Sequence, residues 1–204
     1  MNNANNANNS ERYAQITRET KETKIKLSLC AESSNPGLTG SSGVGFFDHM
    51  LNTFAVHGGF RVELEINGDL GVDCHHSVED IGIVTGMAFR QIINQNKNII
   101  RFASEYIPMD ESLAFCSVDL GGRAYLVFNA EFKASSIGEY DVQMTKEFFY
   151  ALSQNMLANI HINLLYGEND HHKTEAVFKS AAKAIKKALA FAGENNIVSA
   201  KGTI

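Results

Sequence analysis

The residues most able to do chemistry occur in a short pattern that the chain repeats. Residues 75–79 read HHSVE and residues 171–175 read HHKTE, so both copies have the form His-His-x-x-Glu. A His and a Glu three or four positions apart lie on one face of a helix. Each copy can therefore present an imidazole nitrogen and a carboxylate oxygen in the same direction, which is typical of a site for a divalent metal ion.

The two adjacent histidines of each copy point in different directions. Neighbouring residues on a helix are rotated by about 100° around its axis, which suits two metal ions better than one. His49 precedes the first copy, and Glu147 stands at the matching place before the second. Both begin a stretch with an aromatic-rich apolar face, and both are candidates for a ligand that the repeated pattern lacks. We interpret these residues as a binuclear metal site built by an internal duplication.

Composition excludes several classes of function. The 204 residues include 18 Lys and Arg against 23 Asp and Glu, for a formal net charge of −5, so we expect no nucleic-acid or membrane partner. Three widely spaced cysteines favour a reducing compartment over a disulfide framework. No apolar run approaches the roughly 20 residues of a membrane span, and the N-terminus lacks the apolar core of a signal peptide. These features predict a cytoplasmic protein.

The chain is expected to form one domain with a tail at each end. Residues 1–10 are an Asn-rich repeat with little to bury, which predicts disorder. The remaining chain, 11–204, is expected to be a single domain made of two repeats, about 11–97 and 98–195, followed by a C-terminal tail at 196–204.

Hydrophobic periodicity predicts the same order of elements in both repeats. For the first repeat it predicts strands at 11–19, 23–31 and 60–66, a turn at 35–37, a loop at 40–43, and helices at 46–57 and 75–94. For the second it predicts strands at 112–120, 123–132 and 160–164, and helices at 141–157 and 171–192. Hairpin-joined strands with two helices per half indicate an α+β fold in which helices cover one face of a mixed sheet.

Four stretches together resemble the imidazoleglycerol-phosphate dehydratase family of histidine biosynthesis. They are FFDHML at 46–51, DCHHSVED at 73–80, DHHKTEAVFK at 170–179 and SAKG at 199–202. The resemblance covers about residues 12–204 and leaves no residues for a fused second domain. It implies an internally duplicated two-layer α/β sandwich of the ribosomal protein S5 domain 2-like type.

The resemblance implies two Mn²⁺ ions per subunit, each held by residues of both repeats. One ion would be bound by His49, His76, Glu79 and His171, and the other by His75, Glu147, His172 and Glu175. Glu147 stands where the family often has His, and Glu is a workable Mn²⁺ ligand. Mixed imidazole and carboxylate ligands with open positions suit Mn²⁺ or Fe²⁺ better than tetrahedral Zn²⁺.

The family also implies contacts with a small phosphorylated imidazole substrate. The corresponding residues are Glu22, His49, His57, His75, His76, Arg101, Arg123, His171, Lys179, Ser199 and Lys201. Guanidinium and ammonium groups match a phosphate, so the cationic members make sense as a phosphate clamp. Family members are homo-oligomers, 24-subunit shells built from trimers, with active sites between subunits.

The activity that the resemblance implies is that of a hydro-lyase. D-erythro-imidazoleglycerol phosphate would lose water to give imidazoleacetol phosphate in L-histidine biosynthesis. Our hypothesis is that the two metal ions act as Lewis acids on the ring nitrogens and stabilise an imidazolate. Electron push from the ring would expel the hydroxyl group while a carboxylate removes the carbon-bound proton. Glu22 is the candidate for this acid–base role, and Glu175 is the alternative.

Two other functions fit part of the pattern. Paired Glu and His motifs also build carboxylate-bridged di-iron proteins, which are helical bundles with more carboxylate than imidazole ligands. A non-catalytic shell-forming protein that binds metal would explain the ligands but not Glu22 or the basic residues directed at phosphate. The alternating strands and the excess of His over Glu favour the lyase.

Overall fold

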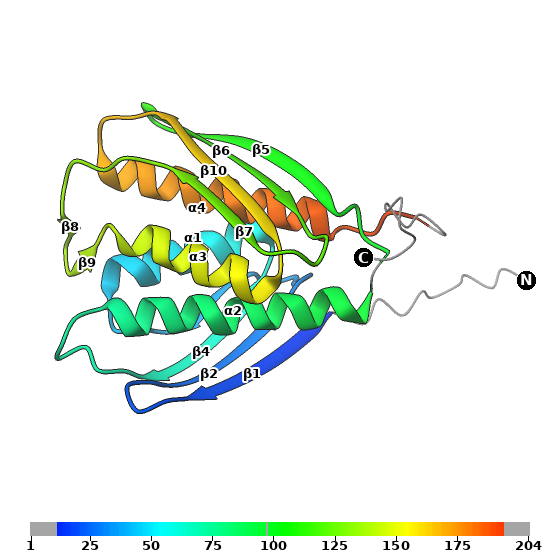
Figure 1. Ribbon diagram of the computed structural model, residues 1–204, viewed down its shortest axis with the longest axis horizontal. Coiled ribbons are helices and arrows are strands. Elements are labelled where there is room, and N and C mark those ends of the chain that lie inside the picture. Colours follow the sequence, from blue (N-terminus) through cyan, green and yellow to red (C-terminus); the bar gives the residue numbers. More distant parts are fainter. Residues whose placement is uncertain (1–11, 97, 194–204) are drawn as a thin grey trace, which may run out of the picture.

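The computed structural model describes residues 12–96 and 98–193, which form two repeats with the same order of elements (Figure 1). The first repeat contains β1 (Tyr13–Glu19), β2 (Lys24–Cys30), β3 (Gly37–Gly40), α1 (Gly45–Gly58), β4 (Arg61–Asn67) and α2 (His75–Gln95). The second contains β5 (Phe102–Met109), β6 (Ser112–Asp119), β7 (Tyr125–Asn129), the short pair β8 (Ser136–Ile137) and β9 (Tyr140–Asp141), α3 (Met144–Met156), β10 (Asn159–Tyr166) and α4 (Asp170–Leu189).

Each repeat folds its main strands into a four-stranded mixed sheet with the same topology. The strand orders are β1-β2-β4-β3 and β5-β6-β10-β7. In both sheets the last pair, β3 with β4 or β7 with β10, is parallel, and the other neighbours are antiparallel. A parallel pair needs a crossover connection, and α1 and α3 provide it. The duplicated α+β fold predicted from the sequence is confirmed.

Two strands differ from the prediction, one in each repeat. Residues 37–40, which run from the end of the expected turn to the start of the expected loop, form β3, a strand too short for a periodic signal. Residues 102–109, to which no element was assigned, form β5 and pair with one edge of β6. The other edge of β6 pairs with β10, as does β7, so the expected hairpin of 112–120 with 123–132 is wrong. β5 is an edge strand whose apolar alternation is interrupted by Glu105, which pairs with Lys187 of α4 at 3.1 Å. An edge strand that carries charge is harder to recognise from periodicity.

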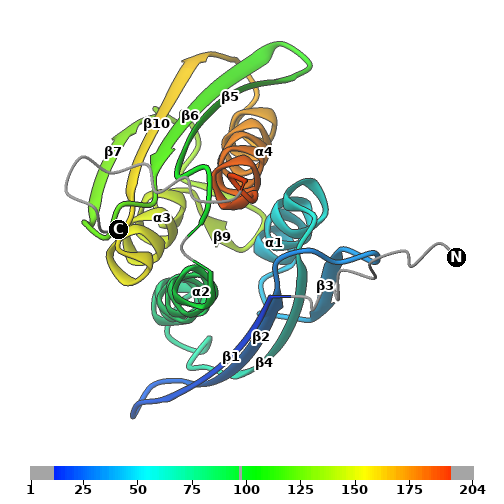
Figure 2. The ribbon, with the colours of Figure 1, turned by 90° about the vertical axis from the view of Figure 1, so that its right-hand side faces the viewer.

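The four helices described lie together between the two sheets, as the end-on view shows (Figure 2). The helices of each repeat cover one face of their own sheet, and the repeats meet helix against helix, α2 on α3 and α1 on α4. Two glycines on one face of α2 allow a close approach to α3. A Cβ at Gly82 would lie 2.7 Å from the carbonyl oxygen of Phe148, and one at Gly86 would lie 2.6 Å from that of Leu152. Any larger side chain would push the repeats apart.

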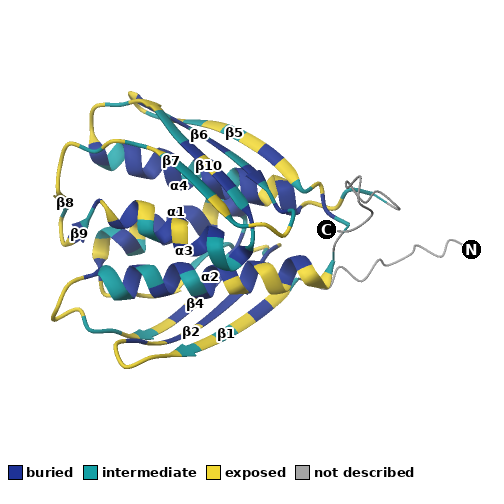
Figure 3. Ribbon diagram, viewed as in Figure 1, coloured by how far each residue is buried: buried dark blue, intermediate teal, exposed yellow. Residues whose placement is uncertain are grey.

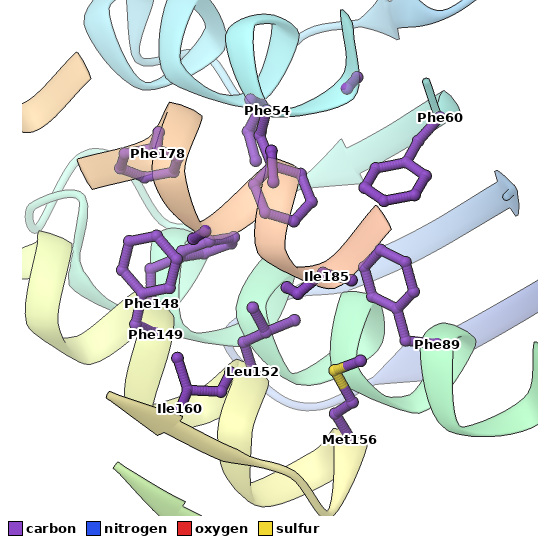
Figure 4. Packing of buried hydrophobic residues seen from close by; sticks show 14 of the residues in the cluster. Phe54, Phe60, Phe89, Phe148, Phe149, Leu152, Met156, Ile160, Phe178 and Ile185 are labelled. Atoms are coloured by element: carbon purple, nitrogen blue, oxygen red, sulfur yellow. The ribbon is translucent and has the colours of Figure 1, made fainter. Parts of the chain in front are cut away.

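The core fills the space where helices face sheets and each other (Figure 3). Aromatic rings from both repeats pack together in it, with Phe148 and Phe178 stacked at 5.3 Å between ring centroids (Figure 4). Phe47 of α1 packs edge-on against Phe148 at 5.4 Å, which ties the first repeat to the second. Such aromatic pairs contribute roughly 0.5–1.5 kcal/mol beyond their buried area. This cluster fixes α1 relative to α3 and α4.

All four helices begin at the same end of the molecule, drawn on the left in Figure 1. Both copies of the His-His-x-x-Glu pattern start a helix, so the fold brings them to that end together with the first turns of α1 and α3. In the described ranges, no helix is both long enough and apolar enough to cross a membrane.

Candidate metal centre

Each histidine pair sits at the first turn of its helix, and a polar residue just before it secures that turn. The Asp73 carboxylate accepts a hydrogen bond from the backbone N–H of His75 at 2.7 Å. The Asn169 side chain accepts one from the N–H of His171 at 2.9 Å. These bonds satisfy N–H groups that a helix start leaves without partners. The repeated pattern is therefore built by the same local device in both halves.

Three predicted ligands from two helices converge in one cluster. His49 of α1 places Nε2 3.5 Å from Oε2 of Glu175, and His171 places Nε2 3.3 Å from the same oxygen. One ligand atom from each of the three lies within 4.8 Å of the other two, so a single ion could contact all of them. His49 belongs to the first repeat and the other two to the second. The cluster thus joins the two repeats.

The carboxylate of Glu175 is the buried member of this cluster, with a residue exposure of 8%. Its second oxygen, Oε1, forms an ion pair with Lys179 at 2.7 Å. Burial by itself raises the pKa of Glu175, but Lys179, His49 and His171 together outweigh burial and the pKa is lowered overall. Glu175 is therefore ionised at neutral pH, with Oε2 directed to the two imidazoles.

The first copy of the pattern forms a separate group. His75 Nε2 lies 3.7 Å from Glu79 Oε2, and His76 Nε2 lies 3.8 Å from Glu22 Oε2 on the β1–β2 turn. Among the described residues, no hydrogen bond or ion pair joins Glu147 to another predicted ligand. The resemblance grouped Glu175 with the ligands His75, Glu147 and His172. Within a single chain, however, Glu175 lies beside His49 and His171. The assignment of ligands to particular ions stays a prediction.

The second histidine of each pair is held by a carboxylate that the sequence analysis did not single out. His76 Nδ1 lies 2.8 Å from Asp69 Oδ2, and His172 Nδ1 lies 2.7 Å from Glu111 Oε2. These contacts raise the pKa of both histidines. The pKa of Glu111 is strongly lowered, chiefly because its carboxylate accepts a hydrogen bond from the backbone of Asn169 and then from His172. Correct placement of β5 would have revealed Glu111, since its turn corresponds to the turn that carries Glu22.

The predicted phosphate contacts at Arg101 and Arg123 lie at the opposite end of the molecule. The N–H of Arg101 bonds to the carbonyl of Ala188, near the end of α4, and the Arg123 carbonyl accepts from Asn159 at the start of β10. Helix α4 has 20 residues, so its two ends are about 30 Å apart at 1.5 Å per residue. One chain therefore does not bring these arginines to the histidine clusters. Arg101 is also paired with Asp119, with Nε 2.7 Å from Oδ1.

The remaining predicted contacts fall into two groups. His57 lies in the last turn of α1, where burial and then the nearby ammonium groups of Lys179 and Lys183 lower its pKa. Lys179 is mostly buried and is engaged by Glu175. Ser199 and Lys201, on the predicted substrate-binding tail, lie outside the described residues.

A buried ion pair holds the start of α4 and so positions its histidines. Asp170 accepts hydrogen bonds from the backbone N–H groups of Lys133 and Ala134 at 2.8 and 2.6 Å, and its other oxygen pairs with Lys173 Nζ at 2.8 Å. Burial raises the pKa of Asp170, but the bond from Lys173 and the two backbone bonds outweigh it and lower the pKa overall. The Asp170 carboxylate thus connects the loop at 133–134 to the start of α4 and pairs with the Lys173 ammonium group.

Replacing this carboxylate should destabilise the metal-free protein. Asp170→Asn leaves Lys173 buried without a counter-charge, and we expect a loss of about 3 kcal/mol in the free energy of unfolding at pH 7. Because the folded pKa of Asp170 is lowered, its contribution is present above the unfolded pKa and disappears as the pH falls below about 4. Urea unfolding of both proteins from pH 7 to pH 3 should therefore show the difference shrinking with acidification. Glu139→Gln, at an exposed carboxylate, should change stability by less than about 0.5 kcal/mol at any pH; a pH-independent Asp170→Asn effect would contradict the account.

Known proteins share both the sequence and the arrangement described above. The sequence model described as imidazoleglycerol-phosphate dehydratase matches residues 42–185. A protein of that name from Streptococcus mutans is 45% identical over 182 residues, which cover 89% of this chain and 93% of the relative. One from Listeria monocytogenes is 44% identical over 181 residues, which cover 88% and 93%.

Solved structures agree with the sequence comparison. The imidazoleglycerol-phosphate dehydratase of Staphylococcus aureus matches with a TM-score of 0.80 at 37% identity, over 88% of this chain and 99% of that one. The enzyme of Pyrococcus furiosus matches with a TM-score of 0.78 at 34% identity, over 93% and 100%. The duplicated fold and the repeated histidine pattern therefore have one explanation, which is that the chain belongs to the imidazoleglycerol-phosphate dehydratase family, the hydro-lyases of histidine biosynthesis.

Proposed function

We propose that the protein dehydrates D-erythro-imidazoleglycerol phosphate to imidazoleacetol phosphate with two Mn²⁺ ions per subunit. The observation that carries the proposal is the cluster of His49, His171 and Glu175, in which two repeats contribute ligands to one point. The reaction is inferred from membership of the family, and the metal ion from the cluster. The resemblance implies two ligand sets, His49, His76, Glu79 and His171 on one ion and His75, Glu147, His172 and Glu175 on the other, so the cluster contains members of both.

The residues present fit a hard or borderline divalent cation. The cluster offers two imidazole nitrogens and one ionised carboxylate oxygen, and no thiolate, a donor set that suits Mn²⁺ or Fe²⁺. Glu175 enters it with one oxygen already neutralised by Lys179, so that the other is free for the metal. His49 and His171 retain side-chain exposures of 47% and 41%, which leaves the outer side of the cluster accessible to substrate.

The chain's own residues provide binding and proton transfer around the metal ions. When bound, the two ions supply Lewis acidity to the substrate's imidazole ring. Glu22 is the candidate acid–base, because its carboxylate is 56% exposed on a turn beside His76 and can meet a substrate carbon. Glu175, the alternative, is buried and occupied by Lys179 and two imidazoles, which suits a ligand better than a proton carrier.

A complete site requires residues from another chain. The histidine clusters and the arginines expected to bind phosphate lie at opposite ends of α4, about 30 Å apart. They can meet around one substrate only if the far end of one subunit approaches the near end of another. This geometry supports a homo-oligomer, proposed to be a 24-subunit shell of trimers, with shared active sites.

The two alternative functions are less well supported. A di-iron carboxylate protein predicts a helical bundle, and the described chain instead has two mixed sheets outside its helices. A non-catalytic metal-binding shell predicts metal uptake without turnover, so it is distinguished by assay.

The proposal is tested by removing and restoring the metal. We expect chelated protein to lose turnover of imidazoleglycerol phosphate and to regain it on addition of Mn²⁺, with two ions bound per chain at saturation. Enolisable ketone product measures activity, and metal analysis of the same samples measures occupancy. Catalysis that survives complete chelation would refute the metal-dependent mechanism, and two bound ions without ketone product would favour the non-catalytic shell.

Substitutions of Glu22 and Glu175 should have different effects on metal binding and on kcat. We expect Glu22→Gln to bind two Mn²⁺ ions normally and to lower kcat by at least about 100-fold, which is typical of a lost acid–base group. Glu175→Gln should weaken binding of one ion, with activity partly restored by excess Mn²⁺. Metal titration and steady-state kinetics measure both effects. Near-normal turnover of fully loaded Glu22→Gln would reassign the acid–base role.

Shared sites predict complementation between two inactive variants. Glu22→Gln and Arg123→Ala should each be nearly inactive alone, because one lacks the acid–base and the other a phosphate contact. If these residues act in one site from different chains, random co-assembly yields about a quarter of sites with both intact. Co-expressed variants carrying different affinity tags, purified over both, should recover activity accordingly. Recovery no greater than the sum of the two variants alone would show that both residues serve a site within one chain.

A further inference from the structure

The second histidine of each pair is bound to a carboxylate through Nδ1. An ionised carboxylate can only accept a hydrogen bond, so when the ring is neutral its proton lies on Nδ1 and its lone pair on Nε2. His76 has this relation to Asp69 at 2.8 Å, and His172 has it to Glu111 at 2.7 Å. In each case Nε2 faces another acidic side chain, Glu22 at 3.8 Å or Asp110 at 3.6 Å. Nε2 is therefore the atom that each ring offers to a cation.

Glu111 is itself held in place by several donors. Its Oε1 accepts hydrogen bonds from the backbone N–H groups of Glu168 and Asn169, at 3.1 and 2.8 Å, and from the hydroxyl of Ser112 at 3.1 Å. The second oxygen, Oε2, is the one that meets His172. One carboxylate thus ties the β5–β6 turn to the loop before α4 and orients the imidazole at the same time.

The two repeats obtain this carboxylate from different places. Glu111 lies on the β5–β6 turn, and the matching β1–β2 turn carries Glu22. In the first repeat the carboxylate comes from Asp69, on the loop between β4 and α2. Its counterpart after β10 is Glu168, since each follows the glycine next to the last strand, and the Glu168 side chain makes no hydrogen bond or ion pair in the described chain. The carboxylate that binds the second histidine therefore comes from the loop before the helix in the first repeat and from the strand–strand turn in the second.

We propose that Asp69 and Glu111 are positioning residues that hold His76 and His172 in the Nδ1–H tautomer, with Nε2 directed to the metal. Carboxylates bound to the far nitrogen of a metal-binding histidine generally fix its tautomer and orientation and raise its basicity. Because Asp69 does this in the first repeat, Glu22 on the matching turn is released from it and is free to meet substrate. The inference rests on the proposed metal function.

Glu111→Gln changes the tautomer while keeping the loop contacts. The amide oxygen can still accept from Glu168 and Asn169, but the amide nitrogen replaces Oε2 and donates to Nδ1 of His172. The proton then moves to Nε2, the atom needed for the metal. We expect the melting temperature of the metal-free variant to stay near that of wild type, and Mn²⁺ affinity at one of the two sites to fall by about 10–100-fold.

Electron paramagnetic resonance of free Mn²⁺ during titration measures affinity and stoichiometry. Glu168→Gln is the matched control, because it removes the same charge from the neighbouring loop, whose backbone contacts Glu111, without touching a histidine. It should bind two ions with wild-type affinity. Wild-type affinity in well-folded Glu111→Gln would overturn the role of Glu111 in metal binding.

The tautomer is read directly in the metal-free protein by solid-state ¹⁵N NMR of ring-labelled histidine, at a pH well above the imidazole range. His172→Gln and His76→Gln identify the two signals. We expect protonated Nδ1 at both in wild type, and protonated Nε2 at His172 in Glu111→Gln. This reading decides the inference whether or not metal binds, so its failure is distinct from failure of the proposed function. If Glu111→Gln does not fold, Asp69→Asn gives the same test at His76, and a wild-type His172 protonated on Nε2 would overturn the proposal.

Discussion

The carboxylate of Glu175 lies nearly out of water among groups from both repeats. A buried charge of this kind is costly by several kcal/mol unless it is paired, and here Lys179 neutralises one oxygen while His49 and His171 face the other. The arrangement exists only if α1 and α4 are held together at a fixed distance. The ring of Phe47, packed on Phe148 and through it on Phe178, provides that support from within the core. The chemistry of the site therefore depends on a contact between repeats that would each be incomplete alone.

Duplication explains why so many ligands gather at one end. Each repeat has the same strand order, so its two helices start at the same edge, and packing helix against helix brings all four starts together. Helix starts present free N–H groups and partial positive charge, which acidic and amide side chains such as Asp73 and Asn169 satisfy. The fold thus places both copies of the repeated pattern at one end, and hydrogen bonds at the helix starts hold their first turns.

The two repeats have the same topology but differ in the contacts of their acidic side chains. The turn that presents Glu22 is exposed, whereas the corresponding turn with Glu111 is bound to the loop before α4. Likewise, Asp170 of the second copy is bound by Lys173 and two backbone groups, whereas the matching position of the first copy is Cys74, which has no carboxylate. More donors therefore converge on the carboxylates of the second repeat. The glutamate of the first copy is the more exposed, with 38% for the Glu79 side chain against 10% for that of Glu175.

The sequence by itself determined the candidate ligands, the repeat, the α+β class and the family, because these depend on local spacing and on motifs that can be recognised without knowledge of packing. It also determined the helices that carry His49 and the two histidine pairs, since their apolar stripes are long. It did not reveal β3 and β5, one too short and the other a charged edge strand, and so it missed the turn on which Glu111 lies. Only the tertiary structure decided that Glu175 meets His49 and His171, that Asp69 and Glu111 hold the second histidines, and that Arg101 and Arg123 lie at the far end. These are relations between segments distant along the chain, and they are set by helix packing and strand pairing, which local patterns do not encode.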